Sequence, residues 1–153
     1  MKKKILLLTA LVFASVFMLT GCTLKKISAD EFKSKAEDFG LTVSDSTSAY
    51  KYLGYIDKLY IAKNSAGWRV EFYELTDEDH AITIYNTNKT KFESAAGSTS
   101  TSSTLTTQDG ERFSVTTGGY YKHVCRIGNT FVYANIKTDY KDEAVKFLKK
   151  IGY

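Results

Sequence analysis

The sequence contains no proline and only two cysteines among its 153 residues. Average usage of about 5% would give roughly seven prolines, so the turns of this chain depend on glycine, asparagine, serine and threonine. Two cysteines cannot build the disulfide framework of a small secreted scaffold. Three of the 21 basic residues (Lys2, Lys3 and Lys4) precede residue 22, and the remaining 18 are balanced by 17 acidic residues, which leaves a net charge of +1. This balance excludes a basic nucleic-acid-binding protein as the default interpretation, so nucleic acid is not an expected partner.

The first 21 residues have the layout of a cleaved export signal. Met1–Lys4 is positively charged, and Ile5–Leu19 is apolar except for one threonine and one serine. The apolar stretch is shorter than the roughly 20 residues that a membrane-spanning helix needs, and it has the length of the apolar region of a secretory signal. Directly after it, Leu19-Thr20-Gly21-Cys22 resembles the lipobox of bacterial lipoproteins.

This resemblance implies a lipid anchor at Cys22. In bacterial lipoproteins the cysteine thiol accepts a diacylglyceryl group and the chain is cut before the cysteine, which here means between Gly21 and Cys22. Two acyl chains of the palmitate type give stable anchoring, where a single chain gives only marginal binding. Membrane lipid is therefore an expected partner, and the extracytoplasmic face of the cell membrane is the expected location. The alternative is a secreted or N-terminally anchored protein in which Cys22 is unmodified.

Residues 22–28 are expected to form a short lipidated tether that keeps the following domain close to the bilayer. Lys25 and Lys26 lie beside the expected anchor. Lysines in this position are attracted to anionic lipid. The alternative is that both lysines are ordinary solvated residues of the tether.

Residues 29–153 are expected to form a single extracytoplasmic α+β domain. Ser28 and Glu31 have the spacing of a capping box, while Gly118-Gly119 and Gly128-Asn129 are two-residue hairpin turns. The apolar pattern predicts helices at 29–39, after a cap at Thr76 and from Thr138, and strands at 41–44, 58–63, 68–75, 112–117, 120–127 and 130–137. Residues 45–57 fit neither period. The predicted architecture is an antiparallel sheet with about three helices packed mainly on one face, with a curved cystatin-like or nuclear-transport-factor-like sheet as a variant.

Two further features bear on the organisation of the domain. Residues 97–107 are nearly all serine and threonine, which predicts an exposed, mobile loop between two halves. In each half a strand runs into a helix through a Thr-Asp pair, at Thr76-Asp77 and at Thr138-Asp139. This likeness predicts a pseudo-repeat of β-hairpin-plus-helix units, although Thr-Asp is also a common helix start and can recur by chance.

Several segments after the signal resemble small uncharacterised lipoproteins of Gram-positive bacteria. They are the opening Ser28-Ala29-Asp30-Glu31-Phe32, the central Glu71–Asp77, the closing Arg126–Thr130 and the terminal Gly152-Tyr153. The resemblance is one of layout and spans most of residues 22–153. It implies no catalytic residues, because such families carry no assigned activity.

Few residues are arranged for catalysis or metal binding. Cys125 and His123 lie two residues apart on one strand face, as a nucleophile and its base or two metal ligands would. A free cysteine is more often a small buried hydrophobe. His80 follows Asp77-Glu78-Asp79, but acids in the first turn of a helix already stabilise its dipole.

Other catalytic patterns are missing from the sequence. There is no glycine-rich phosphate loop and no Gly-x-Ser-x-Gly nucleophile motif. Glu71 and Glu74 are expected on opposite faces of a strand, where they cannot act as an acid–base pair. We therefore predict no catalytic residue, no metal site and no cofactor.

Tyrosine is in clear excess, with 11 residues in the chain. Its large area and polar tip suit recognition surfaces. Tyr50, Tyr52 and Tyr55 cluster in the segment that fits neither period, and Tyr120 and Tyr121 lie at a hairpin turn. Together they are the candidate aromatic surface for a sugar or a peptide. The alternative is that tyrosines fill half-buried positions of the sheet, where they are favoured in any case.

The favoured interpretation is a non-enzymatic binding or interaction module, lipid-anchored at the cell envelope, with an envelope protein or glycan as partner. One alternative is a cell-envelope enzyme that acts on wall or carbohydrate material with a site built from scattered residues. Another is an accessory subunit of a membrane complex. A pocket with converging polar groups and shifted pKa values would favour the enzyme, and an exposed aromatic patch without them would favour binding or assembly.

Overall fold

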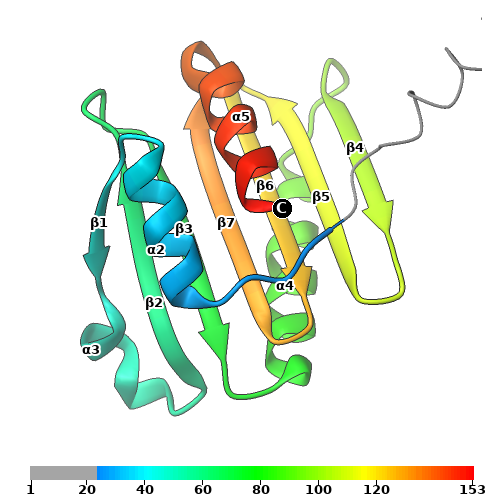
Figure 1. Cartoon of the computed structure of the whole chain (residues 1–153). Coiled ribbons are helices and arrows are strands. Elements are labelled where there is room, and N and C mark those ends of the chain that lie inside the picture. Colours follow the sequence, from blue (N-terminus) through cyan, green and yellow to red (C-terminus); the bar gives the residue numbers. More distant parts are fainter. Residues whose placement is uncertain (1–23) are drawn as a thin grey trace, which may run out of the picture.

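The structure is a computed structural model that describes residues 24–153, so the predicted signal at 1–21 and the lipidation site at Cys22 lie outside the described residues. Its centre is a seven-stranded antiparallel sheet with the strand order β1-β2-β3-β7-β6-β5-β4 (Figure 1). The strands are β1 (Thr42–Asp45), β2 (Ile56–Lys63), β3 (Arg69–Leu75), β4 (Thr101–Thr106), β5 (Gly110–Thr117), β6 (Tyr120–Ile127) and β7 (Thr130–Lys137). The predicted α+β class with an antiparallel sheet is confirmed.

Four α-helices and two 3₁₀ turns accompany the sheet in this part of the chain. They are α2 (Ala29–Asp38), α3 (Thr47–Tyr50), η2 (Lys51–Leu53), α4 (Glu78–Ser94), η3 (Thr138–Tyr140) and α5 (Lys141–Ile151). The Ser28 hydroxyl accepts a hydrogen bond from the Glu31 backbone N–H at 3.2 Å, which is the predicted cap of α2. The cap of α4 is Asp77 rather than Thr76, because the Asp77 carboxylate accepts from the His80 backbone N–H at 2.9 Å.

The helices cover both faces of the sheet, so the prediction that they pack mainly on one face is not confirmed. In Figure 1, α2 and α5 lie in front of the sheet and α4 lies behind it. Neighbouring strand residues explain this arrangement, because Val132 packs with α2 and α5 while Phe131 packs with α4. Both residues are buried, which requires a cover on each side. We call the two sides the α2/α5 face and the α4 face.

The predicted pseudo-repeat is not confirmed either. Each half contains a hairpin followed by a helix, β2–β3–α4 and β6–β7–α5. However, α4 and α5 pack on opposite faces of the sheet. The entry into the helix also differs, because α4 starts directly at its Asp77 cap and α5 is preceded by the 3₁₀ turn η3.

The predicted mobile loop at 97–107 is wrong for its central part, which forms the edge strand β4. This strand pairs with β5 from Thr101 opposite Thr116 to Thr106 opposite Glu111. Threonine is β-branched and favours extended backbone. Pairing with β5 also provides hydrogen-bond partners for the backbone groups along one edge of the segment. All side chains of β4 are exposed except the half-buried Leu105, which accounts for the polar composition.

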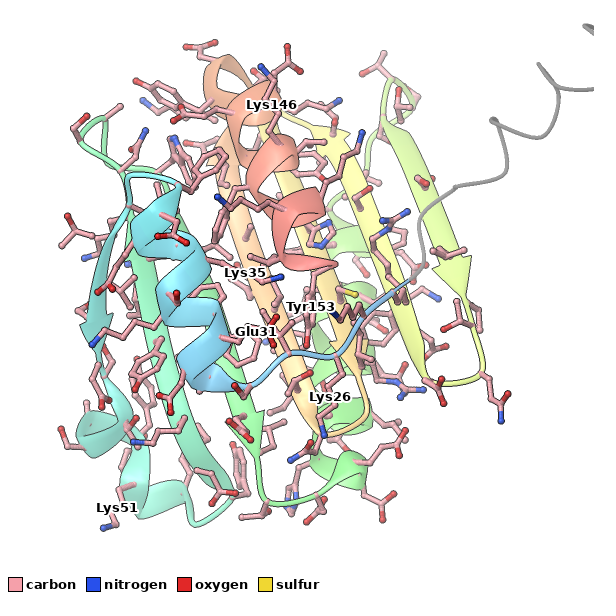
Figure 2. All side chains as sticks on the ribbon, in the orientation of Figure 1. Lys26, Glu31, Lys35, Lys51, Lys146 and Tyr153 are labelled. Atoms are coloured by element: carbon pink, nitrogen blue, oxygen red, sulfur yellow. The ribbon has the colours of Figure 1, made fainter. Side chains whose placement is uncertain are left out.

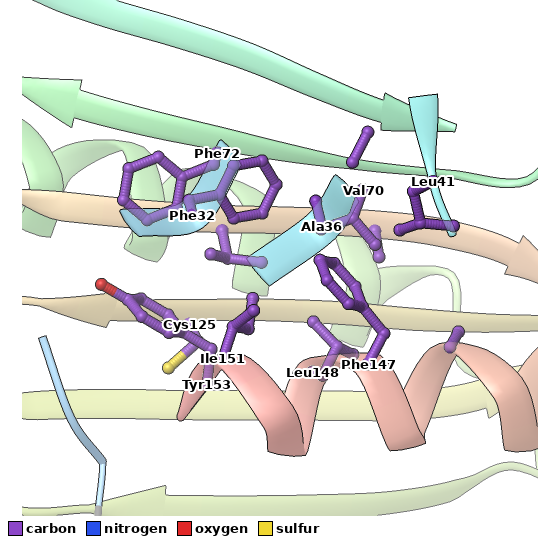
Figure 3. Packing of buried hydrophobic residues seen from close by; sticks show 14 of the residues in the cluster. Phe32, Ala36, Leu41, Val70, Phe72, Cys125, Phe147, Leu148, Ile151 and Tyr153 are labelled. Carbon is purple, nitrogen blue, oxygen red and sulfur yellow. The ribbon is translucent and has the colours of Figure 1, made fainter. Parts of the chain in front are cut away.

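The larger hydrophobic core lies between the sheet and the helices α2 and α5. Phe32 stacks on Phe72 with ring centroids 4.7 Å apart, and Phe147 meets Phe32 edge-on at 5.9 Å (Figure 3). All three rings are fully buried. A second core between the sheet and α4 contains Tyr85 and Phe113.

The chain before α2 is packed on the domain. Residues 24–28, here called the strap, cross the α2/α5 face and lead into α2 (Figure 1). Ile27 is 2% exposed, and Leu24 packs against the larger core. The backbone N–H of Lys25 donates to the carbonyl oxygen of Gly152 at 3.1 Å. The tether predicted for 22–28 is therefore part of the domain from Leu24 onward.

Candidate functional site

The α4 face is only partly covered, because α4 lies mainly over β6 and β7. Two adjoining hollows, of about 500 Å³ and about 430 Å³, share Arg69, Glu71 and Tyr133 in their linings. We call the two together the tyrosine cleft. Its aromatic and polar lining includes Tyr50, Tyr55, Arg69, Glu71, Tyr73, Asn88, Tyr120, Tyr133, Asn135, Lys137 and Tyr140.

The strand register assembles the floor of the cleft. Glu71 of β3 lies directly opposite Tyr133 of β7. Arg69 and Tyr73 lie two residues before and after Glu71, and side chains two residues apart on a strand share a face. The intervening Val70 and Phe72 are in the core on the α2/α5 face. The floor of the cleft therefore consists of Arg69, Glu71 and Tyr73 of β3 together with Tyr133 of β7.

The Glu71 carboxylate is held by two donors on this floor. Its Oε2 accepts a hydrogen bond from the Tyr73 hydroxyl at 2.6 Å, and its Oε1 lies 3.0 Å from Nη2 of Arg69. The Glu71 side chain is 13% exposed, whereas that of Arg69 is 55% exposed. Since a guanidinium has five N–H donors, Arg69 keeps several for a ligand after pairing with Glu71.

The phenols on the floor remain protonated at physiological pH. Burial, together with the hydrogen bond to Glu71, raises the pKa of Tyr73. Burial and the negative charge of Glu71 raise the pKa of Tyr133. These side chains therefore present flat apolar faces and neutral hydroxyl groups. Among the described residues that line the cleft, Glu71 is the only one with a carboxylate, whereas glycosidase chemistry uses two.

Three of the five tyrosines predicted as a recognition surface line the cleft. Tyr50 and Tyr55 line one hollow and Tyr120 lines the other. Tyr52 is 80% exposed and lies outside the lining. Tyr121 is 7% exposed and packs into the core of the α2/α5 face. The structure therefore does not unite all five, because Tyr120 and Tyr121 point to opposite faces of β6.

Three residues of the cleft floor are not among the residues predicted from the sequence: Arg69, Tyr73 and Tyr133. A signal for the first two was present, because they alternate with the core residues of β3. Tyr133 joins them only through the pairing of β3 with β7. That pairing is not local, so the spacing of residues along the chain does not reveal it.

Cys125 and His123 lie on the α2/α5 face, on the opposite side of the sheet from the cleft. Burial raises the pKa of the Cys125 thiol to about 12. Burial, with a smaller effect from Arg112, lowers the pKa of His123 to about 3. Nucleophilic cysteines instead have a lowered thiol pKa. The two side chains are therefore a protonated thiol and a neutral imidazole in the core.

The acidic cluster around His80 has a structural role. His80 Nδ1 lies 2.8 Å from the Asp77 carboxylate that caps α4, and the His80 ring stacks on Tyr55 with centroids 4.8 Å apart. Glu74 lies across the sheet from Glu71, since its Oε2 accepts from the first backbone N–H of α2 at 3.2 Å. Among residues 24–153, no group of three or more His, Cys, Asp or Glu side chains is placed to hold a metal ion.

We expect acidification to destabilise the protein through His123. Its pKa is about 3 in the folded state, compared with an ordinary value of 6.5. Between these two values the unfolded chain binds the extra proton, so the free energy of unfolding falls as the pH decreases from about 6.5 towards 3. Urea unfolding at pH 7 and pH 5 should show a smaller loss for His123→Gln than for the unsubstituted protein. The same substitution at the partly exposed His80 is the control, and an undiminished loss in His123→Gln would contradict the assignment.

Within the described residues, no helix combines the length and the apolar character needed to cross a bilayer. Comparison of the chain with protein-family models, with curated proteins and with solved structures gave no match. The candidate site is therefore defined by the geometry of this chain alone.

Proposed function

We propose that the protein is a lipid-anchored binding module on the extracytoplasmic face of the cell membrane and that it takes its ligand in the tyrosine cleft. The observation that carries the binding role is the cleft itself, with aromatic faces, neutral hydroxyl groups and one carboxylate that is already paired. The lipid anchor is supported by the lipobox-like Leu19-Thr20-Gly21-Cys22. The cleft supports the binding role, and the lipobox-like sequence supports the anchor.

An envelope glycan is the ligand class that fits the lining best. Tyrosine rings offer flat faces for the apolar side of a sugar ring and hydroxyl groups for its rim. Arg69 and Asn135 add donors and an acceptor. The pairing of Arg69 with Glu71 balances the two charges on the floor, and the lining also contains Lys137. The neutral hydroxyl groups around this pair favour a hydroxyl-rich ligand.

The shifted pKa values in the cleft support binding rather than catalysis. Converging polar groups with shifted pKa values can indicate an enzyme. Here, however, the shifts of Tyr73 and Tyr133 are upward, away from the physiological range in which a general acid or base works. Both groups therefore act as neutral partners for a ligand.

The test is retention of the purified lipidated protein on solubilised wall glycan. Arg69→Ala and Tyr133→Ala should each weaken binding about tenfold, because buried aromatic and arginine contacts dominate binding sites of this kind. Tyr52→Ala is the matched control and should bind normally, since Tyr52 lies outside the cleft lining. Near-UV circular dichroism would verify that each variant is folded.

Three results would count against the proposal. Equal glycan binding by all three variants would remove the cleft from the binding site. Release of new reducing ends from the glycan would favour the envelope-enzyme alternative. Recovery of a stoichiometric membrane protein in place of glycan would instead favour the accessory-subunit alternative.

A further inference from the structure

The strap is locked to the end of α5. The hydrogen bond from Lys25 N–H to the Gly152 carbonyl is accompanied by a close approach of the two residues. A Cβ atom built on Gly152 would lie 3.1 Å from both the Cβ and the carbonyl oxygen of Lys25. Gly152 also has φ +88°, a conformation that glycine adopts without steric cost. The position of the strap therefore depends on the glycine that ends α5.

The start of the strap is fixed next to β5. A Cβ atom built on Gly110 would lie 3.1 Å from Cδ1 of Leu24. Only Thr23 separates Leu24 from Cys22. Two residues of fully extended chain span at most ~7 Å. A lipid on Cys22 would therefore enter the bilayer close to Leu24, with almost no slack between the anchor and the domain.

The region around the strap is basic. Its exposed lysines, here called the strap–α5 lysines, are Lys25, Lys26, Lys146, Lys149 and Lys150. Figure 2 shows Lys26 and Lys146 on the side turned to the viewer, the α2/α5 face. Residues 24–28 and 144–153 contain no acidic residue. The acidic residues on this face include those of α2, where Glu31 pairs with Lys35 at 3.2 Å, and those in the first turn of α5. They also include Glu74 of β3, which accepts a hydrogen bond from the first residue of α2.

We infer that the strap–α5 lysines form a contact surface for anionic lipid headgroups and that this contact fixes the orientation of the anchored domain. The inference rests on the lipid attachment at Cys22 proposed above. Anionic membrane surfaces attract lysines within about one Debye length, ~10 Å at moderate salt. The short link from Cys22 holds Lys25 and Lys26 within that range. Lys149 and Lys150 adjoin them through the contact of Lys25 with Gly152.

This orientation has a consequence for the tyrosine cleft. The strap–α5 lysines belong to the α2/α5 face, whereas Arg69, Glu71 and Tyr133 belong to the α4 face. When the first face contacts the bilayer, the second is turned away from it. The cleft then opens towards the cell wall, where a glycan ligand would be found.

The test uses the lipidated full protein, reconstituted in vesicles, with one added cysteine for a fluorescent label. Lys149→Cys places the label on the proposed contact surface, and Lys91→Cys places it on the exposed side of α4. Cys22 carries the lipid and Cys125 is buried, so the added cysteine takes the label. A headgroup-attached quencher should quench the label at position 149 several-fold more than the label at position 91 in anionic vesicles. The difference should shrink in zwitterionic vesicles and at high salt.

A charge-reversed variant distinguishes the effect of the lysines from the effect of the lipid anchor. Adding Lys146→Glu and Lys150→Glu to Lys149→Cys should abolish the preferential quenching while membrane attachment persists. Equal quenching at positions 149 and 91 of a lipidated protein would overturn the orientation and leave the proposed function intact. A protein recovered without lipid would overturn the attachment, and this inference with it.

Discussion

Replacement of Cys22 by alanine should move the protein from the membrane fraction to the soluble fraction. The substitution removes the thiol that the lipobox-like sequence offers to a diacylglyceryl group, and two acyl chains bury many methylenes at about 0.8 kcal/mol each. Within residues 24–153, no helix is long and apolar enough to cross a bilayer. We expect a large loss of membrane association, because the acyl chains are the proposed anchor. It can be measured by fractionating cells and washing the membranes without detergent.

The matched control is the same substitution at the other cysteine. Cys125 is buried in the core, so Cys125→Ala should cost some stability but leave the protein in the membrane fraction. Persistence of Cys22→Ala in washed membranes would contradict the lipid anchor. The mature N-terminus provides an independent measurement. Cleavage between Gly21 and Cys22 would leave a lipid-modified Cys22 as the first residue of the mature protein, which mass spectrometry can detect.

Local patterns in the sequence predict most strands and helices, but not the faces that the helices cover. The caps of α2 and the glycine-containing hairpin turns depend on residues a few positions apart, and both are found close to the predicted places. The position of α4 depends on pairs such as Phe131 and Val132, which are buried on opposite faces of β7. A run of consecutive apolar residues in a strand indicates a strand that is buried on both faces, and β7 contains such a run from Phe131 to Ala134.

The edge strand β4 shows how a distant partner overrides composition. Its serine and threonine side chains are small and polar and give no sign of a buried face. Composition alone therefore predicts an exposed, mobile loop. The ladder with β5 supplies hydrogen bonds that no local pattern of 97–107 reveals. Threonine's preference for extended backbone then agrees with the ladder.

The candidate site was predictable only in part for the same reason. The excess of tyrosine predicts an aromatic recognition surface, and Tyr50, Tyr55 and Tyr120 do line the cleft. The centre of the cleft requires Glu71 to meet Tyr133 across β3 and β7. This contact joins the two halves of the domain, and the spacing of tyrosines along the chain carries no information about it.

Replacement of Phe72 by alanine should reduce the free energy of unfolding by about 3–5 kcal/mol, the usual range for a buried phenylalanine. Phe72 is fully buried on the inner strand β3 and stacks on Phe32 at 4.7 Å. Its ring also meets Tyr153 edge-on, with centroids 5.9 Å apart. The substitution therefore removes contacts to α2 and to the C-terminal end at once. Domains of this size are commonly stable by only about 5–15 kcal/mol, so a large share of the stability would be lost.

Urea unfolding measures this loss as a shift of the midpoint at an unchanged slope. Tyr52→Ala is the control, because Tyr52 is 80% exposed and a surface substitution usually changes stability by no more than about 0.5 kcal/mol. A loss of similar size in both variants would contradict the placement of Phe72 at the centre of the core. Tyr153 contacts Phe72 and also the backbone of Ile27 in the strap, so Phe72→Ala should also loosen residues 24–28. Hydrogen exchange at Lys25 N–H, which donates to Gly152, should therefore accelerate in Phe72→Ala but not in Tyr52→Ala.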